Sequence, residues 1–379
     1  MTAGQSSRHI EALQSLRGIA ALVVAVSHLS TFYEIPTAIR LTIDTVLNAH
    51  ASVVVFYVLS GFVLTGSLVR SGLNPPSIKS FYLRRLYRLI PAMWVVTLIS
   101  LALLMLLPPL GPRPKTSEWL ESSNFGLPTP LILVASFLAL KNNLIMPIWT
   151  VFIEFVASLF MPIFVAAAVH FRRALIPIVA VTGATPFVMA GWPHRLNSIS
   201  DLWFFLLGVA VALSAPTVRA PRSSAFIALA GLIFFRGVLH YSYTGHVQSL
   251  SYGYMDPLPA VVEGLTAAVL ISIIAQGKDY IHLLRHDASV WLGDISYSLY
   301  LVHFPIGLAT AKLISSFFPQ ISAEQAALLM LGGALPTSIL VSHALYRLIE
   351  LPFIRLGSRN TTGARPDDTS PKKEQIAAP

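Results

Sequence analysis

An arginine and a histidine stand eleven residues apart in the first apolar stretch of the chain, at Arg17 and His28. Eleven residues of α-helix make three turns plus about 20°, so both side chains lie on one face, about 16 Å apart along the axis. Lipid solvates neither group well, and an ionisable side chain in a membrane span faces a partner, a cavity or water. The pair therefore indicates a functional site. The alternative is that Arg17 reaches the membrane surface and His28 bonds to a neighbouring helix.

His28 has the side chain best suited to move a proton near neutral pH, because the unperturbed pKa of histidine is about 6.5. Apolar surroundings would keep the imidazole neutral, which is the form that a general base needs. We therefore expect His28 and Arg17 to be catalytic.

Three arginines, Arg84, Arg85 and Arg88, lie in the segment FYLRRLYRLIP. Their spacing of three and four residues brings them together on a helix. Guanidinium groups bind phosphate through paired donors, so the cluster predicts a site for a phosphate-bearing ligand. Positive charge at the cytoplasmic end of a span, or binding to anionic lipid, explains the same cluster without a substrate.

Glu154 ends the segment WTVFIE, one turn into an apolar stretch. A carboxylate at this depth needs a cationic partner, which Arg17, His28 or an inner-loop arginine could supply. Glu154 is expected either to act in catalysis or to form a structural ion pair between helices.

A polar stripe follows in the segment GDISYSLYLVHF, where Ser296, Tyr300 and His303 share one helical face at i, i+4 and i+7. Such residues in a membrane helix either contact a substrate or form hydrogen bonds between helices. Both interpretations stay open here.

Three other features have structural interpretations. Gly61, in FYVLSGFVL, permits close approach of another helix or of a thin acyl chain. Arg347 and Glu350 stand three residues apart and can pair. His282 and His286 form an i, i+4 pair without a nearby third ligand, so no metal site is expected.

The composition is that of an integral membrane protein. Of 379 residues, 55% are hydrophobic and 11% are charged, with a mean hydropathy of +0.69, whereas soluble domains carry about 25% charged residues. The chain has no cysteine, which excludes disulfides, thiolate nucleophiles and thiolate–zinc sites. The net charge of +9 is expected in short loops between spans, so no nucleic-acid partner is predicted.

Apolar runs predict an all-α, polytopic membrane protein with about ten transmembrane helices. The expected spans are 13–33, 50–69, 89–108, 147–169, 174–190, 199–214, 223–239, 257–275, 289–312 and 325–349. The run 131–140 is too short to cross and predicts a re-entrant or interfacial helix.

The distribution of Lys and Arg predicts that both termini are cytoplasmic. The outer side then receives few cations, among them Arg236 and Lys312. We divide the chain into a cytoplasmic N-terminal segment at 1–12, a transmembrane domain at 13–356 and a disordered cytoplasmic tail at 357–379, whose composition is polar.

Taken together, six segments in this order resemble the membrane acyltransferase family 3, whose bacterial members acylate surface sugars. The segments are LRGIAALVVAVSH, FYVLSGFVL, FYLRRLYRLIP, IWTVFIE, GDISYSLYLVHF and YRLIELPF. The resemblance implies that Arg17 and His28 are essential and that Arg84, Arg85 and Arg88 form the basic motif. Two mild departures are Thr150, where the family usually has Ser, and Tyr57, where it commonly has Phe.

The resemblance implies an enzyme of the bacterial cytoplasmic (inner) membrane that takes an acyl group, most commonly acetyl, from acyl-CoA. No permanently bound cofactor is implied. The acceptor is expected to be a hydroxyl of a cell-surface or lipid-linked carbohydrate, such as exopolysaccharide, the O-antigen of lipopolysaccharide or peptidoglycan. A macrolide-like small molecule stays open as acceptor, and the oligomeric state is not predicted.

A transporter is the alternative, because buried Arg, Glu and His also form proton or substrate relays in carriers. Carriers usually show paired half-repeats with broken helices at matching places, and the sequence has no such repeat.

Overall fold

The computed structural model describes residues 3–110, 116–123, 126–190, 198–214, 221–244, 256–277 and 281–361. Within these ranges the regular elements are all helices, and the one pairing of β type is an isolated bridge between Tyr33 and Thr116. The all-α prediction is confirmed.

The elements have the following bounds. The α-helices are α1 (Ala3–Ser30), α2 (Thr37–Val46), α3 (Ala49–Ser71), α4 (Pro75–Leu106), α5 (Glu118–Ser123), α6 (Pro130–Phe137), α7 (Ile148–His170), α8 (Leu175–Thr182), α9 (Thr185–Met189), α11 (Leu202–Ser214), α12 (Arg222–Thr244), α13 (Pro257–Ala275), α14 (Asp287–Asp294), α15 (Ser296–Phe317), α16 (Ala323–Leu329), α17 (Leu335–Leu345) and α18 (Leu351–Thr361).

Seven described segments are long and apolar enough to cross a membrane: Glu11–Ser30, Thr37–Ser71, Pro75–Leu106, Ile148–His170, Pro257–Ala275, Ser296–Phe317 and Ala323–Thr361. Two further apolar helices, Ile199–Ser214 and Ser223–Leu239, are shorter. The range 174–190, expected as one span, is divided between α8 and α9. The protein is therefore a polytopic membrane protein, with seven rather than ten segments that meet these criteria in the described part.

The basic motif lies inside a continuous helix rather than before one. α4 begins at Pro75, well ahead of the expected start at 89, and its N-cap Asn74 accepts a hydrogen bond from the backbone of Ser77. Proline at the first helical position, after an asparagine cap, is a typical helix start. Hydropathy marks only the apolar part of such a helix, so the expected boundary was too late.

The segment expected as a single span at 289–312 consists of two helices. α14 ends at Asp294, the chain turns at Ile295, and α15 runs on to Phe317. The short run 131–140 forms α6, which is eight residues long and does not cross.

The end of the chain is more helical than expected. From Ala323 to Thr361 it is helical throughout, with π-helical turns at Met330–Ala334 and Tyr346–Glu350. α18 therefore extends into the range assigned to the tail, and residues from 362 onward lie outside the described part.

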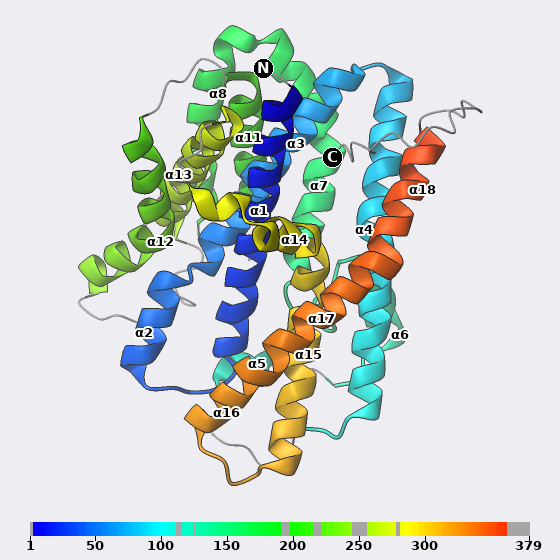
Figure 1. Ribbon diagram of the computed structural model, residues 1–379, viewed down its shortest axis with the longest axis vertical. Helices are drawn as coiled ribbons and strands as arrows, with labels where there is room; N and C mark the ends of the chain where they lie inside the picture. The colour runs from blue at the N-terminus through cyan, green and yellow to red at the C-terminus, as the bar shows by residue number, and fades with distance from the viewer. Residues whose placement is uncertain are drawn as a thin grey trace.

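In Figure 1, α1 passes through the middle of the helix bundle, and α14 lies across it about halfway along its length. The two elements are in close contact, because a Cβ on Gly18 would lie 2.4 Å from the backbone nitrogen of Gly293. The first residues of α1 and the last residues of α18 lie at the same end of the bundle, the upper end in this view.

Gly61 allows α3 and α11 to touch. A Cβ at this position would lie 2.2 Å from the carbonyl oxygen of Phe205, a distance that no side chain permits. Sequence analysis left two roles open for Gly61, the close approach of another helix or of a thin acyl chain. The structure shows the close approach of a helix.

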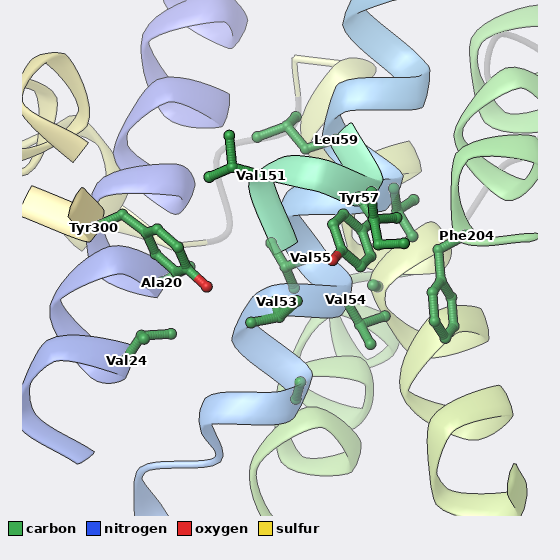
Figure 2. Close-up of a cluster of buried hydrophobic side chains, with 14 of the residues drawn as sticks. Ala20, Val24, Val53, Val54, Val55, Tyr57, Leu59, Val151, Phe204 and Tyr300 are labelled. Carbon is green, nitrogen blue, oxygen red and sulfur yellow. The ribbon is translucent and has the colours of Figure 1, made fainter. Parts of the chain in front are cut away.

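The core between α1, α3 and α7 is made of small and β-branched side chains. Figure 2 shows Ala20 and Val24 of α1 at the left of the cluster, Val53 to Val55 of α3 in its middle and Phe204 of α11 at the right. The ring of Tyr300 of α15 lies beside α1 in the same view, so the polar stripe of α15 borders this core.

Candidate active site

His28 lies near the end of α1 and forms a pair with another histidine. Its Nδ1 is 2.9 Å from Nε2 of His303, and the two rings are stacked with centroids 5.2 Å apart. His303 is fully buried, whereas His28 is partly exposed. Sequence analysis left open whether Glu154 orients His28, but the partner that the structure gives His28 is His303.

Aromatic side chains surround the pair. Trp119 of α5 lies 5.4 Å from His28 between ring centroids, and it also packs edge-on against Phe32 and Phe304. The chain near Trp119 is tied to the end of α1, because the backbone nitrogen of Ser117 donates to the carbonyl oxygen of Phe32 over 3.1 Å. Sequence analysis missed Trp119, whose only signal was an aromatic side chain between two expected spans.

Arg17 lies among charged groups. Its Nη2 donates to the carbonyl oxygen of Gly293 over 3.1 Å, and its Nε is buried without a hydrogen-bond partner. The charges of Arg88, Glu350 and Glu154 act on it. Arg17 thus has N–H donors that the described residues do not use. The positive charge of the nearby Arg88 makes the binding of an anion there more favourable.

The three arginines of the basic motif have different surroundings. Arg85 is paired with Glu154 at 2.5 Å and its Nε donates to Ser158 over 3.2 Å. Arg84 donates to the Thr361 hydroxyl of α18 over 3.4 Å. Arg88 is buried, and within the described ranges it forms no hydrogen bond or ion pair that satisfies its guanidinium.

Glu350 is the carboxylate that faces the arginines from the C-terminal segment. It is 2% exposed, accepts a hydrogen bond from the Ser298 hydroxyl over 2.8 Å, and its charge acts on Arg88 and Arg17. The sequence allows an ion pair between Arg347 and Glu350, but the described contact of the Glu350 carboxylate is the hydrogen bond from Ser298. Because Glu350 belongs to a π-helical turn, its direction does not follow from an α-helical spacing.

The stripe Ser296, Tyr300 and His303 is buried, but only its last member reaches His28. The Ser296 hydroxyl donates to the carbonyl oxygen of Gly293, which caps the end of α14. The Tyr300 hydroxyl accepts a hydrogen bond from Thr150 over 2.7 Å and so joins α15 to α7. Two of the three residues therefore form hydrogen bonds between elements, which is one of the two interpretations left open.

A second buried charge cluster lies apart from these residues, between α3, α12 and α13. Both oxygens of Glu263 accept hydrogen bonds from Arg236, at 2.8 and 2.9 Å. Asn48 donates to Glu263 over 2.8 Å, and His50 Nδ1 lies 2.5 Å from it. Sequence analysis missed the cluster, although opposite charges inside two apolar runs, 223–239 and 257–275, were the available signal.

Two cations assigned to the outer loops lie inside helices. Arg236 is 3% exposed within α12, and Lys312 is 3% exposed within α15. They therefore do not add positive charge to the outer loops. The excess of Lys and Arg on the expected cytoplasmic side, from which the orientation is predicted, is then larger. Among the residues that the structure describes, no three His, Asp or Glu side chains are grouped so that they could hold a metal ion.

Comparison with known proteins identifies the class. The model of a family described as "Acyltransferase domain" matches residues 10–347. The chain belongs to this family and is a membrane acyltransferase.

Two relatives show how far the similarity extends. Acyltransferase MdmB of Streptomyces mycarofaciens is 29% identical over 96% of this chain and 97% of its own length. Peptidoglycan O-acetyltransferase OatA of Listeria monocytogenes is 23% identical over 95% of this chain and 58% of its own length. The chain thus spans nearly all of the first relative and little more than half of the second. No solved structure matches the chain.

Proposed function

We propose that the protein is an O-acyltransferase that moves an acyl group, most simply acetyl, from acyl-CoA to a hydroxyl of a cell-surface or lipid-linked carbohydrate. The observation that carries this proposal is that α1 presents two functional groups inside the bundle. Arg17 has a side-chain donor that no described residue accepts and lies within reach of the charge of Arg88, and about 16 Å further along the helix the partly exposed His28 lies among aromatic rings.

The arginines supply the features that a coenzyme A donor requires. Its phosphates carry several negative charges, and guanidinium groups bind such oxygens through paired, charge-assisted hydrogen bonds. Arg17 and Arg88 can do so: Arg17 Nε has no hydrogen-bond partner among the described residues, and Arg88 is buried beside the charges of Glu350 and Glu154. Arg84 lies beside them on α4, and Arg85 is held by Glu154, so we assign Arg85 and Glu154 the task of keeping α4 and α7 in place around the donor.

His28 would act at the other end of the donor. Its free ring nitrogen takes the proton from the acceptor hydroxyl, and the hydroxyl oxygen attacks the carbonyl carbon of the thioester. The tetrahedral intermediate collapses, the carbon–sulfur bond breaks, and the CoA thiolate leaves and takes up the proton from His28. A tyrosine hydroxyl would stabilise the oxyanion. Arg17 lies about 16 Å from His28 along α1, so its task would be to hold the donor in register.

A covalent route uses the same residue. His28 would first accept the acyl group on its ring nitrogen, release CoA, and then pass the group to the hydroxyl. A labelled acyl group that stays on the protein when no acceptor is present would indicate this route. Its absence in a single-turnover experiment would indicate direct transfer.

The acceptor class rests on the relatives and on the position of His28. OatA is named a peptidoglycan O-acetyltransferase, which is an enzyme that acts on a surface glycan. With the N-terminus of α1 in the cytoplasm, His28 lies toward the outer end of its helix, where such an acceptor would arrive. We therefore place the enzyme as a multi-pass protein of the bacterial inner membrane.

The test compares the surface glycans of cells that carry the protein, lack it, or carry His28→Ala. Mass spectrometry of these glycans should show an acyl substituent only with the unchanged protein. An identical glycan pattern in all three, together with no transfer of label from radioactive acetyl-CoA to envelope glycans by the purified protein, would overturn the proposal.

A further inference from the structure

We propose that His303 is a positioning residue that fixes the tautomer and the orientation of His28, so that His28 presents an unprotonated Nε2 to the reacting hydroxyl. This inference rests on the proposed function of His28. It assigns a task to a residue of α15 that lies 275 positions away in the sequence and does not itself reach the substrates.

The direction of the hydrogen bonds follows from the backbone. His303 Nδ1 lies 3.1 Å from the carbonyl oxygen of Leu299, and a carbonyl oxygen can only accept. In a neutral imidazole Nδ1 of His303 therefore carries the hydrogen, and Nε2 of the same ring is an acceptor.

His28 must then be the donor in the pair of rings. Its Nδ1 lies 2.9 Å from the acceptor Nε2 of His303, so the hydrogen of a neutral His28 is on Nδ1. Nε2 of His28 is left with its lone pair, which is the form required for a general base and equally for a nucleophile. The second hydrogen bond of a functional histidine commonly sets its tautomer in this way.

His303 is held too firmly to turn away. The residue is fully buried on a continuous helix, and the ring of Tyr300 packs edge-on against it with centroids 5.8 Å apart. Tyr300 is itself fixed by the hydrogen bond from Thr150 of α7. The partly exposed His28 is thus the member of the pair that meets the substrates, and His303 acts through it.

The arrangement also supports the proton transfer. When Nε2 of His28 takes the proton of the hydroxyl, the ring becomes an imidazolium, and its Nδ1–H continues to donate to His303. His303 keeps the same single hydrogen on Nδ1 throughout, so the proton is returned from His28 to the leaving thiolate and nothing accumulates on the second ring.

Two substitutions at His303 separate positioning from packing. In His303→Gln the side-chain oxygen can accept from Nδ1 of His28 in the place of the ring nitrogen, whereas His303→Leu fills the space without an acceptor. We expect His303→Leu to lower turnover at saturating acetyl-CoA about 10- to 100-fold, as is usual for a residue that orients a functional histidine. His303→Gln should restore most of that loss, and the KM for acetyl-CoA should stay within about twofold in both, because the donor arginines are untouched.

The assay uses purified full-length protein, radioactive acetyl-CoA, and envelope glycans from cells that lack the protein. Because the chain has no cysteine, a thiol reagent measures CoA release without background. Turnover of His303→Leu equal to that of the unchanged protein, with His28→Ala inactive, would overturn the role of His303 alone. Activity of His28→Ala would instead overturn the proposed function.

A second measurement does not depend on activity. Nitrogen NMR of the unchanged protein, labelled with ¹⁵N in its histidines, distinguishes a ring nitrogen that carries hydrogen from one that does not. The signals of His28 are those missing from His28→Ala. We expect them to report hydrogen on Nδ1, and hydrogen on Nε2 would overturn the inference.

Discussion

The two ionisable side chains of α1 meet different neighbours. Arg17 lies among charges from α4, α7 and the C-terminal segment, whereas His28 lies among rings from α5 and α15. One helix thus presents a guanidinium and an imidazole in separate environments. These are the environments that the proposed binding of a donor phosphate by Arg17 and the proposed proton transfer by His28 require.

Replacing His28 should abolish transfer without unfolding the protein. His28 contributes little to the core because its ring is partly exposed. We expect His28→Ala to lose acyl transfer while its thermal unfolding midpoint stays close to that of the unchanged protein. The exposed His170 at the end of α7 gives the control, since His170→Ala should keep full activity. Transfer by His28→Ala at the normal rate would remove the central assignment.

Replacing Arg88 should weaken donor binding more than it slows the reaction. A hydrogen bond to a charged group contributes about 1.5–3 kcal/mol, which corresponds to a change of about 10- to 100-fold. We expect Arg88→Gln to raise the KM for acetyl-CoA by this factor with a smaller fall in kcat. The matched control is Arg70→Gln, an exposed arginine at the end of α3. An unchanged KM would mean that the positive charge of Arg88 serves only to orient α4 in the membrane.

At this scale the sequence predicts the residue types but not their partners. The eleven-residue spacing places Arg17 and His28 on one face, and the spacing i, i+4 and i+7 places Ser296, Tyr300 and His303 on one face. The contact of His28 with His303 depends on how α1 packs against α15, which no local pattern encodes. The same holds for Glu154, whose need for a cation was predictable and whose choice of Arg85 was not.

Among the elements, α3, α12 and α13 are joined by the Glu263 cluster rather than by apolar packing alone. Removing one partner of a buried ion pair costs about 3–5 kcal/mol, because it leaves the other charge uncompensated. We expect Glu263→Ala to lower the unfolding midpoint strongly, as followed by tryptophan fluorescence in detergent. The exposed Glu34 is the control, and Glu34→Ala should leave the midpoint unchanged.

The double replacement tests the reason for that loss. Arg236→Met with Glu263→Leu removes both charges and fills the space with apolar atoms, which is often neutral or stabilising. We expect the double variant to recover most of the stability lost in Glu263→Ala. If it is no more stable than Glu263→Ala, the loss comes from the altered packing and not from an unpaired charge.

The sequence predicts where apolar helices lie better than where they begin, end or break. Hydropathy located the cores of α1, α3, α7 and α13 because these are continuous apolar runs. It placed the start of α4 too late, since that helix begins in polar sequence at an Asn-Pro signal. It also joined α14 to α15, because the turn at Ile295 sits in apolar sequence and is stabilised by the contact of Gly293 with α1.

For the molecule as a whole, orientation in the membrane decides which substrate reaches which end of α1. The described ends of the chain lie on one side of the bundle, together with the start of α4, whose Arg84 donates to Thr361 at the end of α18. The segment with Trp119 lies at the other end of α1, beside His28. The donor and the acceptor would therefore approach from opposite sides.

Two introduced cysteines test this orientation. The chain has none of its own, so a membrane-impermeant thiol reagent labels only the introduced residue. Ser71 and Ser122 are both exposed, at the end of α3 and in α5. We expect Ser71→Cys to react only after the cells are permeabilised and Ser122→Cys to react in intact cells. The reverse pattern would invert the protein and the direction of transfer.

The contacts between α1 and the α14–α15 segment bind the two together at two separated levels. Gln14 of α1 donates to Asp294 and Arg17 donates to Gly293, while His28 meets His303. A sliding or tilting of one helix against the other would break one of these attachments, so we expect α1, α14 and α15 to move as one unit. Any movement that admits substrates and releases products is then expected in the surrounding elements.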